Sequence, residues 1–148
     1  MDSETIERII WSTQIGRKRF LGCFPSDKIP KALRYPMALI INEDPSTGNG
    51  THWVACYIEN QNSICYFDSY GKDPISVIKN YLDNFVNIKK NNTRFQSFLS
   101  QNCGYYCIYF VFFICLNVPF KTIMKTLSNV FNLDLFVQLF VKKHFISQ

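Results

Sequence analysis

The chain has 148 residues, of which 47% are hydrophobic and 16% aromatic. This composition excludes a disordered protein and predicts a single folded domain, residues 1–148, with a substantial core. The formal net charge of +5 is mild, which is typical of a solvated surface; contact with nucleic acid is the alternative, although no nucleic-acid recognition motif is present.

The amino-terminal segment is charged and predicts a helix rather than a secretory signal. We therefore expect an intracellular protein whose cysteines are reduced and which is not secreted. The longest apolar run, Tyr105–Leu116, is shorter than the ~18–20 residues that a bilayer span requires, so no membrane partner is expected.

In chain order, the first predicted element is a helix that Asp2 or Ser3 caps and that runs to about Gln14. The following segment, Gly16–Pro36, is rich in glycine and proline and is predicted to be irregular. A short apolar strand is predicted at Met37–Asn42.

A flexible loop, Glu43–Thr51, precedes two strand-like runs. These runs, His52–Glu59 and Ser63–Asp68, are joined by Asn-Gln-Asn and predict a β-hairpin. After a turn, Asp73 is predicted to cap a helix that has proline at its first position and reaches about Asn87.

The last third of the chain predicts a strand at Thr93–Phe98 and then a buried helix that contains Cys103 in its first turn and the whole apolar run that follows. The helix should stop near Asn117–Pro119, and one or two further helices are predicted within Phe120–Phe145. Together these elements predict an α+β fold, with a central, mostly antiparallel sheet flanked by helices on both sides.

Cys103 is the candidate nucleophile. At the start of a helix, the dipole and the unpaired backbone N–H groups favour the thiolate, which is the reactive form. Gln96 lies seven positions earlier, so the chain can fold back and aim its side-chain amide above the sulfur. That amide and the Cys103 N–H would form an oxyanion hole. Gln101 and Asn102 are alternatives, but their side chains would have to bend back past their own backbone.

A thiolate nucleophile requires a base, and the base requires a group that orients it. The chain has two histidines. His52 follows a loop and opens a strand, whereas His144 lies in a basic tail without a motif, so His52 is the candidate base. Asp68 ends the second strand-like run and is the candidate orienting carboxylate. Asp73 is a weaker alternative because it is needed as a helix cap.

The other five cysteines occur without a convincing metal-ligand spacing, so no metal site is predicted. Those in apolar strands and in the apolar helix are expected to be buried small apolar side chains: Cys56, Cys65, Cys107 and Cys115. For Cys23, the sequence leaves open an exposed redox thiol and a groove residue.

Several of these residues lie in segments that resemble a known family. His52–Trp53, then Y-F-D-S-Y-G at residues 66–71, then Q-S-x-x-x-x-x-C-G-x-Y-C from Gln96, resemble the adenain-like cysteine proteases. This group contains the adenovirus maturation protease and lies within the wider Ulp/sentrin protease group. The segment Phe20–Pro30 is similar to the one that leads into the substrate groove of these enzymes.

The resemblance implies a papain-like fold of the adenain/Ulp type and a cysteine endopeptidase with a Cys-His-Asp triad. The nucleophile comes last along the chain, whereas papain has it first. Trp53 would form a wall of the substrate groove, and Gly104 would let a substrate backbone approach closely. A narrow groove there would favour cleavage at Gly-containing sites.

The implied substrates are viral structural-protein precursors during virion maturation, in the host nucleus or cytoplasm and in the virion. The rival interpretations are a protease for ubiquitin-like modifiers and a binding module that retains the fold without catalysis. No cofactor is required for the chemistry, but the resemblance implies DNA or a viral peptide as an activator. The peptide activator of the adenovirus enzyme is disulfide-linked to a cysteine between the acid and the glutamine, and no cysteine lies between Asp68 and Gln96.

Overall fold

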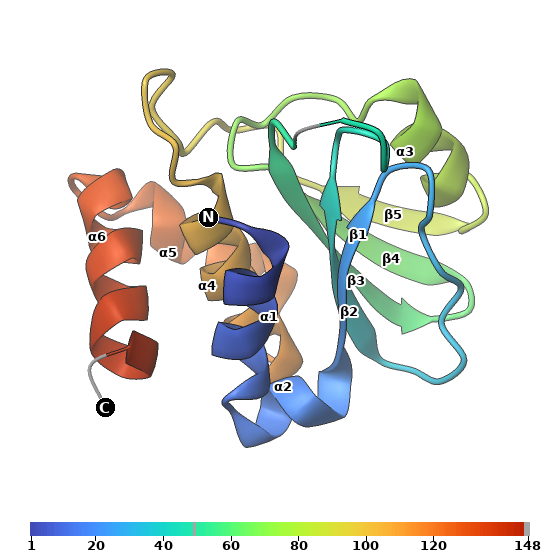
Figure 1. The fold of residues 1–148 in the computed structure, drawn as a ribbon, viewed down its shortest axis with the longest axis horizontal. Coiled ribbons are helices and arrows are strands. Elements are labelled where there is room, and N and C mark those ends of the chain that lie inside the picture. Colours follow the sequence, from blue (N-terminus) through green and yellow to red (C-terminus); the bar gives the residue numbers. More distant parts are fainter. Residues whose placement is uncertain (49, 147–148) are drawn as a thin grey trace.

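A five-stranded mixed sheet forms the centre of the molecule in the computed structural model, which describes residues 1–48 and 50–146 (Figure 1). The strands lie in chain order across the sheet: β1 (Phe20–Pro25), β2 (Met37–Asn42), β3 (Trp53–Asn60), β4 (Ser63–Phe67) and β5 (Asn87–Lys90). The β3–β4 hairpin is antiparallel as predicted, and β2–β3 is also antiparallel. The two outer pairings are parallel, so the sheet is mixed rather than mostly antiparallel.

Helices cover both faces of the sheet, as predicted (Figure 1). One face carries α3 (Ser76–Leu82), and the other carries the remaining helices: α1 (Ser3–Trp11), α2 (Gln14–Arg19), α4 (Cys103–Cys115), α5 (Phe120–Ser128) and α6 (Leu133–Val141). A short π-helical segment, Lys142–Ile146, follows α6. This is a three-layer α+β arrangement.

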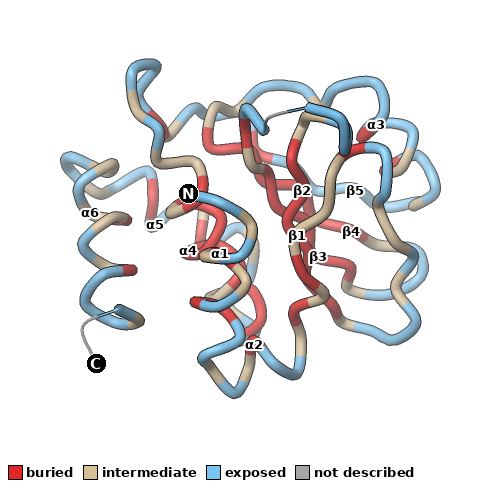
Figure 2. Tube along the Cα trace, in the orientation of Figure 1, coloured by how far each residue is buried: buried red, intermediate tan, exposed pale blue. Residues whose placement is uncertain are grey.

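The strands β2 and β3 are apolar on both faces because both faces are covered. Along β2, Ala38 and Ile40 pack toward α4, while Leu39 and Ile41 pack toward α3. All six residues of β2 are buried, and the first five form a continuous apolar run rather than an alternating one. Figure 2 shows this buried centre as red segments through the middle of the sheet.

Helix α4 is buried between the sheet and α6, which explains why its sequence is apolar all round. Phe110 stacks on Phe67 of β4 with ring centroids 4.8 Å apart. The chain leaves the helix through Asn117, at φ 66°, and Pro119, where the sequence predicts the stop. Within residues 1–48 and 50–146, no helix combines the length and the apolar character that crossing a membrane would require.

The amino-terminal half differs from the predicted elements in two places. The first helix ends at Trp11 rather than near Gln14, because the Thr13 hydroxyl accepts the N–H of Gly16 at 3.0 Å and starts α2. The segment predicted to be irregular contains β1, which pairs with β2. A strand held by a partner more than a dozen residues away leaves little local signal for sequence reasoning.

The segment after the β3–β4 hairpin also differs from the helix that the sequence predicts. Asp73 does not cap a helix; it is 86% exposed and forms an ion pair with Lys90 at 2.5 Å. Helix α3 begins only at Ser76, with no side-chain cap, and ends at Leu82. The residues from Asn87 onward then form the edge strand β5 instead of the end of a helix.

The predicted strand at Thr93–Phe98 is wrong, and its residues form a loop. The N–H groups of Phe95 and Gln96 both donate to the Ser69 carbonyl, at 2.8 and 2.9 Å. Hydrogen bonds to one turn after β4, rather than a strand ladder, therefore place Gln96.

Candidate active site

Cys103 is the first residue of α4 and is half-buried. The N-cap residue Asn102 makes no side-chain capping hydrogen bond, so the first N–H groups of the helix can face a ligand or a nearby anion. The backbone N–H groups of Trp53 and Gly104 lie near the sulfur and help to lower the pKa of the thiol. The predicted placement of Cys103 in the first turn of a buried helix is confirmed.

His52 lies between Cys103 and Asp68. Its Nε2 is 2.6 Å from Asp68 Oδ1, and the Cys103 thiol is close enough to the ring to raise the pKa of the imidazole. The Tyr70 ring stacks on the imidazole with centroids 4.6 Å apart. The structure thus brings together the three side chains that the sequence singles out, in the order carboxylate, imidazole, sulfur.

The loop before β3 is organised around Asp44. Its carboxylate accepts the Gly50 N–H at 3.0 Å and the Thr51 hydroxyl at 3.1 Å, and its own N–H donates to the Asn42 side chain at 2.8 Å. The Glu43 N–H donates to the His52 carbonyl at 2.9 Å. These bonds fix the main chain that delivers the imidazole.

Asp68 is 1% exposed and is held by its backbone as well as its side chain. Asn91 accepts the Asp68 N–H at 3.0 Å and donates to the Asp68 carbonyl at 2.6 Å. Oδ1 also accepts the Tyr70 N–H at 2.9 Å. The turn closes at Gly71, at φ +66°, where an added Cβ would lie only 2.6 Å from the Thr93 backbone.

The neighbours of Cys103 and His52 favour the ionised pair. Burial lowers the pKa of His52, but hydrogen bonds and charge interactions with Asp68 and Cys103 outweigh burial and raise it from 6.5 to about 9. Burial raises the pKa of Cys103, but the imidazole and the two backbone N–H groups outweigh it and lower that pKa below 9.0. Both shifts act in the same direction and favour the thiolate–imidazolium form of the pair.

The pKa values of the other five cysteines shift in the opposite direction. Burial raises the pKa of each of these thiols, namely Cys23, Cys56, Cys65, Cys107 and Cys115. Among the six cysteines, all of which the structure describes, the lowered pKa belongs to Cys103 alone. The four cysteines predicted to be buried are buried, and Cys23 lines a groove.

Gln96 is 1% exposed, and its amide has one fixed orientation. The Ser69 hydroxyl donates to Oε1 at 2.5 Å, and Nε2 donates to the Ser100 carbonyl at 2.8 Å. An amide nitrogen carries two hydrogens, so one remains for a ligand in the cleft that Gln96 lines. Of the two alternatives, Asn102 is bonded to the Asp134 carbonyl at 3.3 Å, and Gln101 is exposed at the cleft.

Sequence reasoning missed three residues that hold the site. Ser69 orients the Gln96 amide, Tyr70 stacks on His52, and Asn91 fixes the Asp68 backbone. The first two lie within the Y-F-D-S-Y-G segment, which could have indicated them. The sequence around Asn91 does not indicate this role, because the role depends on a contact with Asp68, 23 positions earlier in the chain.

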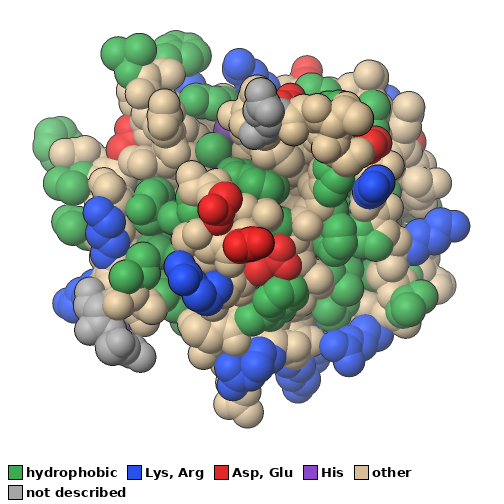
Figure 3. Space-filling view, viewed as in Figure 1, with side chains coloured by type: hydrophobic (Ala, Val, Ile, Leu, Met, Phe, Trp, Pro, Cys, Tyr) green, Lys and Arg blue, Asp and Glu red, His purple; other side chains and the backbone are tan. Residues whose placement is uncertain are grey.

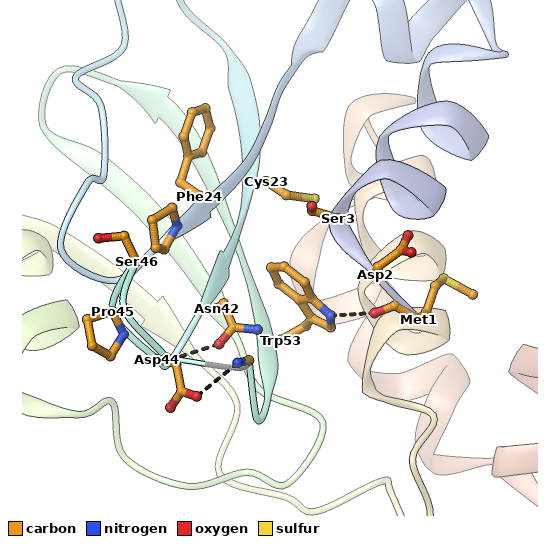
Figure 4. A pocket seen from close by; sticks show the side chains of 13 residues that line it. Met1, Asp2, Ser3, Cys23, Phe24, Asn42, Asp44, Pro45, Ser46 and Trp53 are labelled. Atoms are coloured by element: carbon orange, nitrogen blue, oxygen red, sulfur yellow. Dashed lines mark hydrogen bonds between the residues drawn. The ribbon is translucent and has the colours of Figure 1, made fainter.

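A cleft of about 570 Å³ contains Cys103, His52 and Gln96 in its lining. It continues past Trp53 into a groove of about 580 Å³ that reaches Phe24, and Met1, Asn42, Gly50 and Trp53 line both. Figure 4 shows this groove, with the Trp53 indole donating to the Met1 carbonyl at 3.0 Å. Trp53 thus lies where a groove-wall residue was expected.

Contrary to what the resemblance implied, Gly104 does not lie where a substrate backbone could approach it closely. This glycine is buried against Met1 and Ile6, with an added Cβ 3.3 Å from Met1 Cβ, and it does not line the cleft. Its contribution is the N–H that faces the sulfur. His144 lies beyond α6, with Nδ1 2.9 Å from the Phe140 carbonyl, and takes no part in the cleft. In the part of the chain that the structure describes, no three His, Cys, Asp or Glu side chains are grouped to hold a metal ion.

Comparisons with solved structures show which fold the chain has. The chain superposes on the crystal structure of the ASFV pS273R protease with a TM-score of 0.63 and 20% identity, over 97% of this chain and 64% of that one. The chain has the fold of that protease. A central domain of the uncharacterized Legionella pneumophila protein Lpg1148 matches with a TM-score of 0.54 and 13% identity, over 97% of this chain and 95% of that domain.

In sequence, the chain is 29% identical over 100 residues to R355 of Acanthamoeba polyphaga mimivirus, whose name assigns it provisionally to the thiol proteases. The match covers 60% of this chain and 33% of R355. The chain thus matches about a third of that relative and spans 64% of the ASFV protease. No protein-family model matches the sequence.

Proposed function

We propose that this chain is a cysteine endopeptidase. The observation that carries the proposal is the pairing of His52 with Asp68 on one side and with Cys103, at the start of α4, on the other. This pairing lowers the pKa of one thiol out of six. A low-pKa thiolate in an open cleft is the feature that separates reactive from structural cysteines. The similarity to a protein named among the thiol proteases supports the same chemistry.

In the proposed reaction, the Cys103 thiolate attacks the carbonyl carbon of a peptide bond, and the carbonyl electron pair moves to oxygen. The remaining Gln96 N–H and the Cys103 N–H stabilise this oxyanion. The C–N bond then breaks, the His52 imidazolium gives its proton to the leaving nitrogen, and a thioester remains. Water attacks the thioester carbonyl while neutral His52 takes one of its protons. The C–S bond then breaks, which releases the carboxylic acid product and restores the thiolate and the imidazolium.

The proposed substrates are viral structural-protein precursors cut at Gly-containing sites. A groove with the Trp53 ring as one wall favours residues without a bulky side chain beside the scissile bond. Two proteins similar to this chain, R355 and the ASFV pS273R protease, are viral. We propose action in the infected cell and the virion, with DNA or a viral peptide as the candidate activator.

Incubation with three substrate sets tests the proposal: peptides with Gly-Gly and Gly-Ala pairs, viral structural precursors, and fusions to ubiquitin-like modifiers. Each set is assayed with and without double-stranded DNA, and products are identified by mass spectrometry. We expect cleavage of the peptides and the precursors after small residues. Cleavage of modifier fusions alone would transfer the proposal to that substrate class, and no cleavage of any set would contradict it.

Replacing Gln96 by alanine should lower kcat by about 10²–10³-fold with little change in KM, because the oxyanion develops only in the transition state. Steady-state kinetics on a Gly-containing peptide measures the effect. Gln101→Ala is the matched control, because Gln101 lines the same cleft but is exposed. Equal losses in the two variants would contradict the assignment of the oxyanion donor to Gln96.

A further inference from the structure

A turn at Ser97–Ser100 projects from the molecule just before α4, as the gold segment in Figure 1. The Ser100 N–H donates to the Ser97 carbonyl at 3.1 Å and closes the turn. Its tip carries two adjacent large apolar side chains, Phe98 and Leu99, which are 69% and 96% exposed. We call this pair the apolar tip. Hydrophobic side chains gather over the projecting segment in Figure 3, and its trace is pale blue in Figure 2.

The apolar tip belongs to the catalytic cleft. Phe98 and Leu99 line the same cleft of about 570 Å³ as His52, Gln96 and Cys103. A polypeptide whose scissile carbonyl lies at the Cys103 sulfur must pass along this lining. Single exposed apolar residues are ordinary on protein surfaces, but an adjacent pair at the mouth of a catalytic cleft marks a contact site.

The turn is held in place without a substrate. The Ser97 N–H donates to Asp134 at the start of α6, at 3.3 Å, and the Tyr70 hydroxyl donates to the Ser100 carbonyl at 3.3 Å. The Arg94 guanidinium lies 3.6 Å from the centre of the Phe98 ring, in a cation–π contact. A surface that is already ordered loses little conformational entropy when a ligand binds to it.

We propose that the apolar tip is a substrate-recognition surface, and that good substrates carry a large apolar side chain close to the scissile bond. The inference rests on the proposed endopeptidase function and names a second requirement besides the small residue at the cleavage site. The occupant is an extended segment of the polypeptide substrate, because the tip is continuous with the cleft. Covering the exposed side chain of Leu99 is expected to change affinity about 10-fold.

Alanine substitutions at the tip test the proposal. Deleting residues from the turn would not separate recognition from catalysis, because the Ser100 carbonyl in the turn also accepts the hydrogen bond from Gln96. A peptide panel moves a single leucine through the positions on either side of a Gly-Gly pair in an otherwise Gly/Ser sequence. Binding is measured by fluorescence anisotropy on the inactive Cys103→Ala protein, and kcat and KM are measured on the active one.

We expect one leucine position to improve binding and to lower KM by about 10-fold, with kcat little changed. Phe98→Ala and Leu99→Ala should lose this preference. The matched control is Leu33→Ala, which removes a side chain that is 97% exposed and lies outside the cleft, and which should keep the preference.

A preference that survives in both tip variants, or that is absent from the wild-type protein, would overturn the proposal. If the peptides bind with the expected leucine preference but are not cleaved, the recognition surface is supported and the endopeptidase function is contradicted. Failure of one proposal can therefore be told apart from failure of the other. Analytical sedimentation tests whether a second copy of the chain, instead of a substrate, covers the apolar tip. A wild-type dimer that Leu99→Ala dissociates would assign the tip to a second copy of the chain and overturn the proposal.

Discussion

Replacing Cys103 by alanine is expected to abolish peptide hydrolysis, lowering kcat by about 10⁴-fold or more. The reaction requires a sulfur anion, and the other five thiols have raised pKa values. Cys103→Ser should be nearly as inactive, because a serine hydroxyl ionises far less readily than a thiol. The measurement is hydrolysis of the best Gly-containing peptide, with thermal unfolding to confirm that each variant is folded.

Cys115→Ala is the matched control for this loss. Cys115 is the last residue of the same helix, is buried, and lies outside the cleft. Its replacement removes one small apolar group and should leave the rate within a few-fold of wild type. A Cys103→Ala protein that retained more than about 1% of wild-type turnover would exclude Cys103 as the nucleophile.

Replacing Asp68 by asparagine should lower kcat/KM by about 10²–10⁴-fold. The carboxylate favours the protonated imidazole, so its removal should bring the pKa of His52 down from about 9 toward ~6.5. The pKa of Cys103 should then rise, because the imidazolium that stabilises its thiolate is no longer populated at neutral pH. The shape of the side chain is kept, and Oδ2, the second carboxylate oxygen, makes no hydrogen bond with a described residue.

NMR titration of the His52 ring protons measures this shift directly, and peptide kinetics measures the loss of rate. Asp73→Asn is the control, because it removes the same charge five positions further along the chain. The Asp73 side chain is 86% exposed and paired with Lys90. Its effect on the pKa of His52 should be small, because exposed charges are screened. An unchanged pKa of His52 in Asp68→Asn would contradict the role of Asp68.

The sequence predicts the parts of the structure whose signals are local. The run of apolar residues after Cys103 predicts α4, and the two strand-like runs joined by Asn-Gln-Asn predict the hairpin that carries His52 and ends beside Asp68. Those two elements and one turn already bring the imidazole, the carboxylate and the sulfur together. Most of the candidate site could therefore be predicted without coordinates.

The parts that sequence reasoning misses depend on partners distant in the chain. The strand β1 exists because β2 is available beside it, and Gln96 is placed by the Ser69 carbonyl, 27 positions earlier, rather than by a strand. Gly104 follows the nucleophile and suggests an open groove, but α1 packs over it. In each case a tertiary contact overrides a local pattern.

The rate at which iodoacetamide alkylates Cys103 as a function of pH tests the thiolate–imidazolium pair most directly, because it requires no substrate. Peptide mapping by mass spectrometry separates this cysteine from the other five. In the wild-type protein, Cys103 should react fastest, with a midpoint below 9.0. In His52→Ala the midpoint should rise toward ~9 or above, because burial then acts without the imidazole. A wild-type midpoint at or above 9.0, the same midpoint in both proteins, or equal labelling of several cysteines would contradict the account.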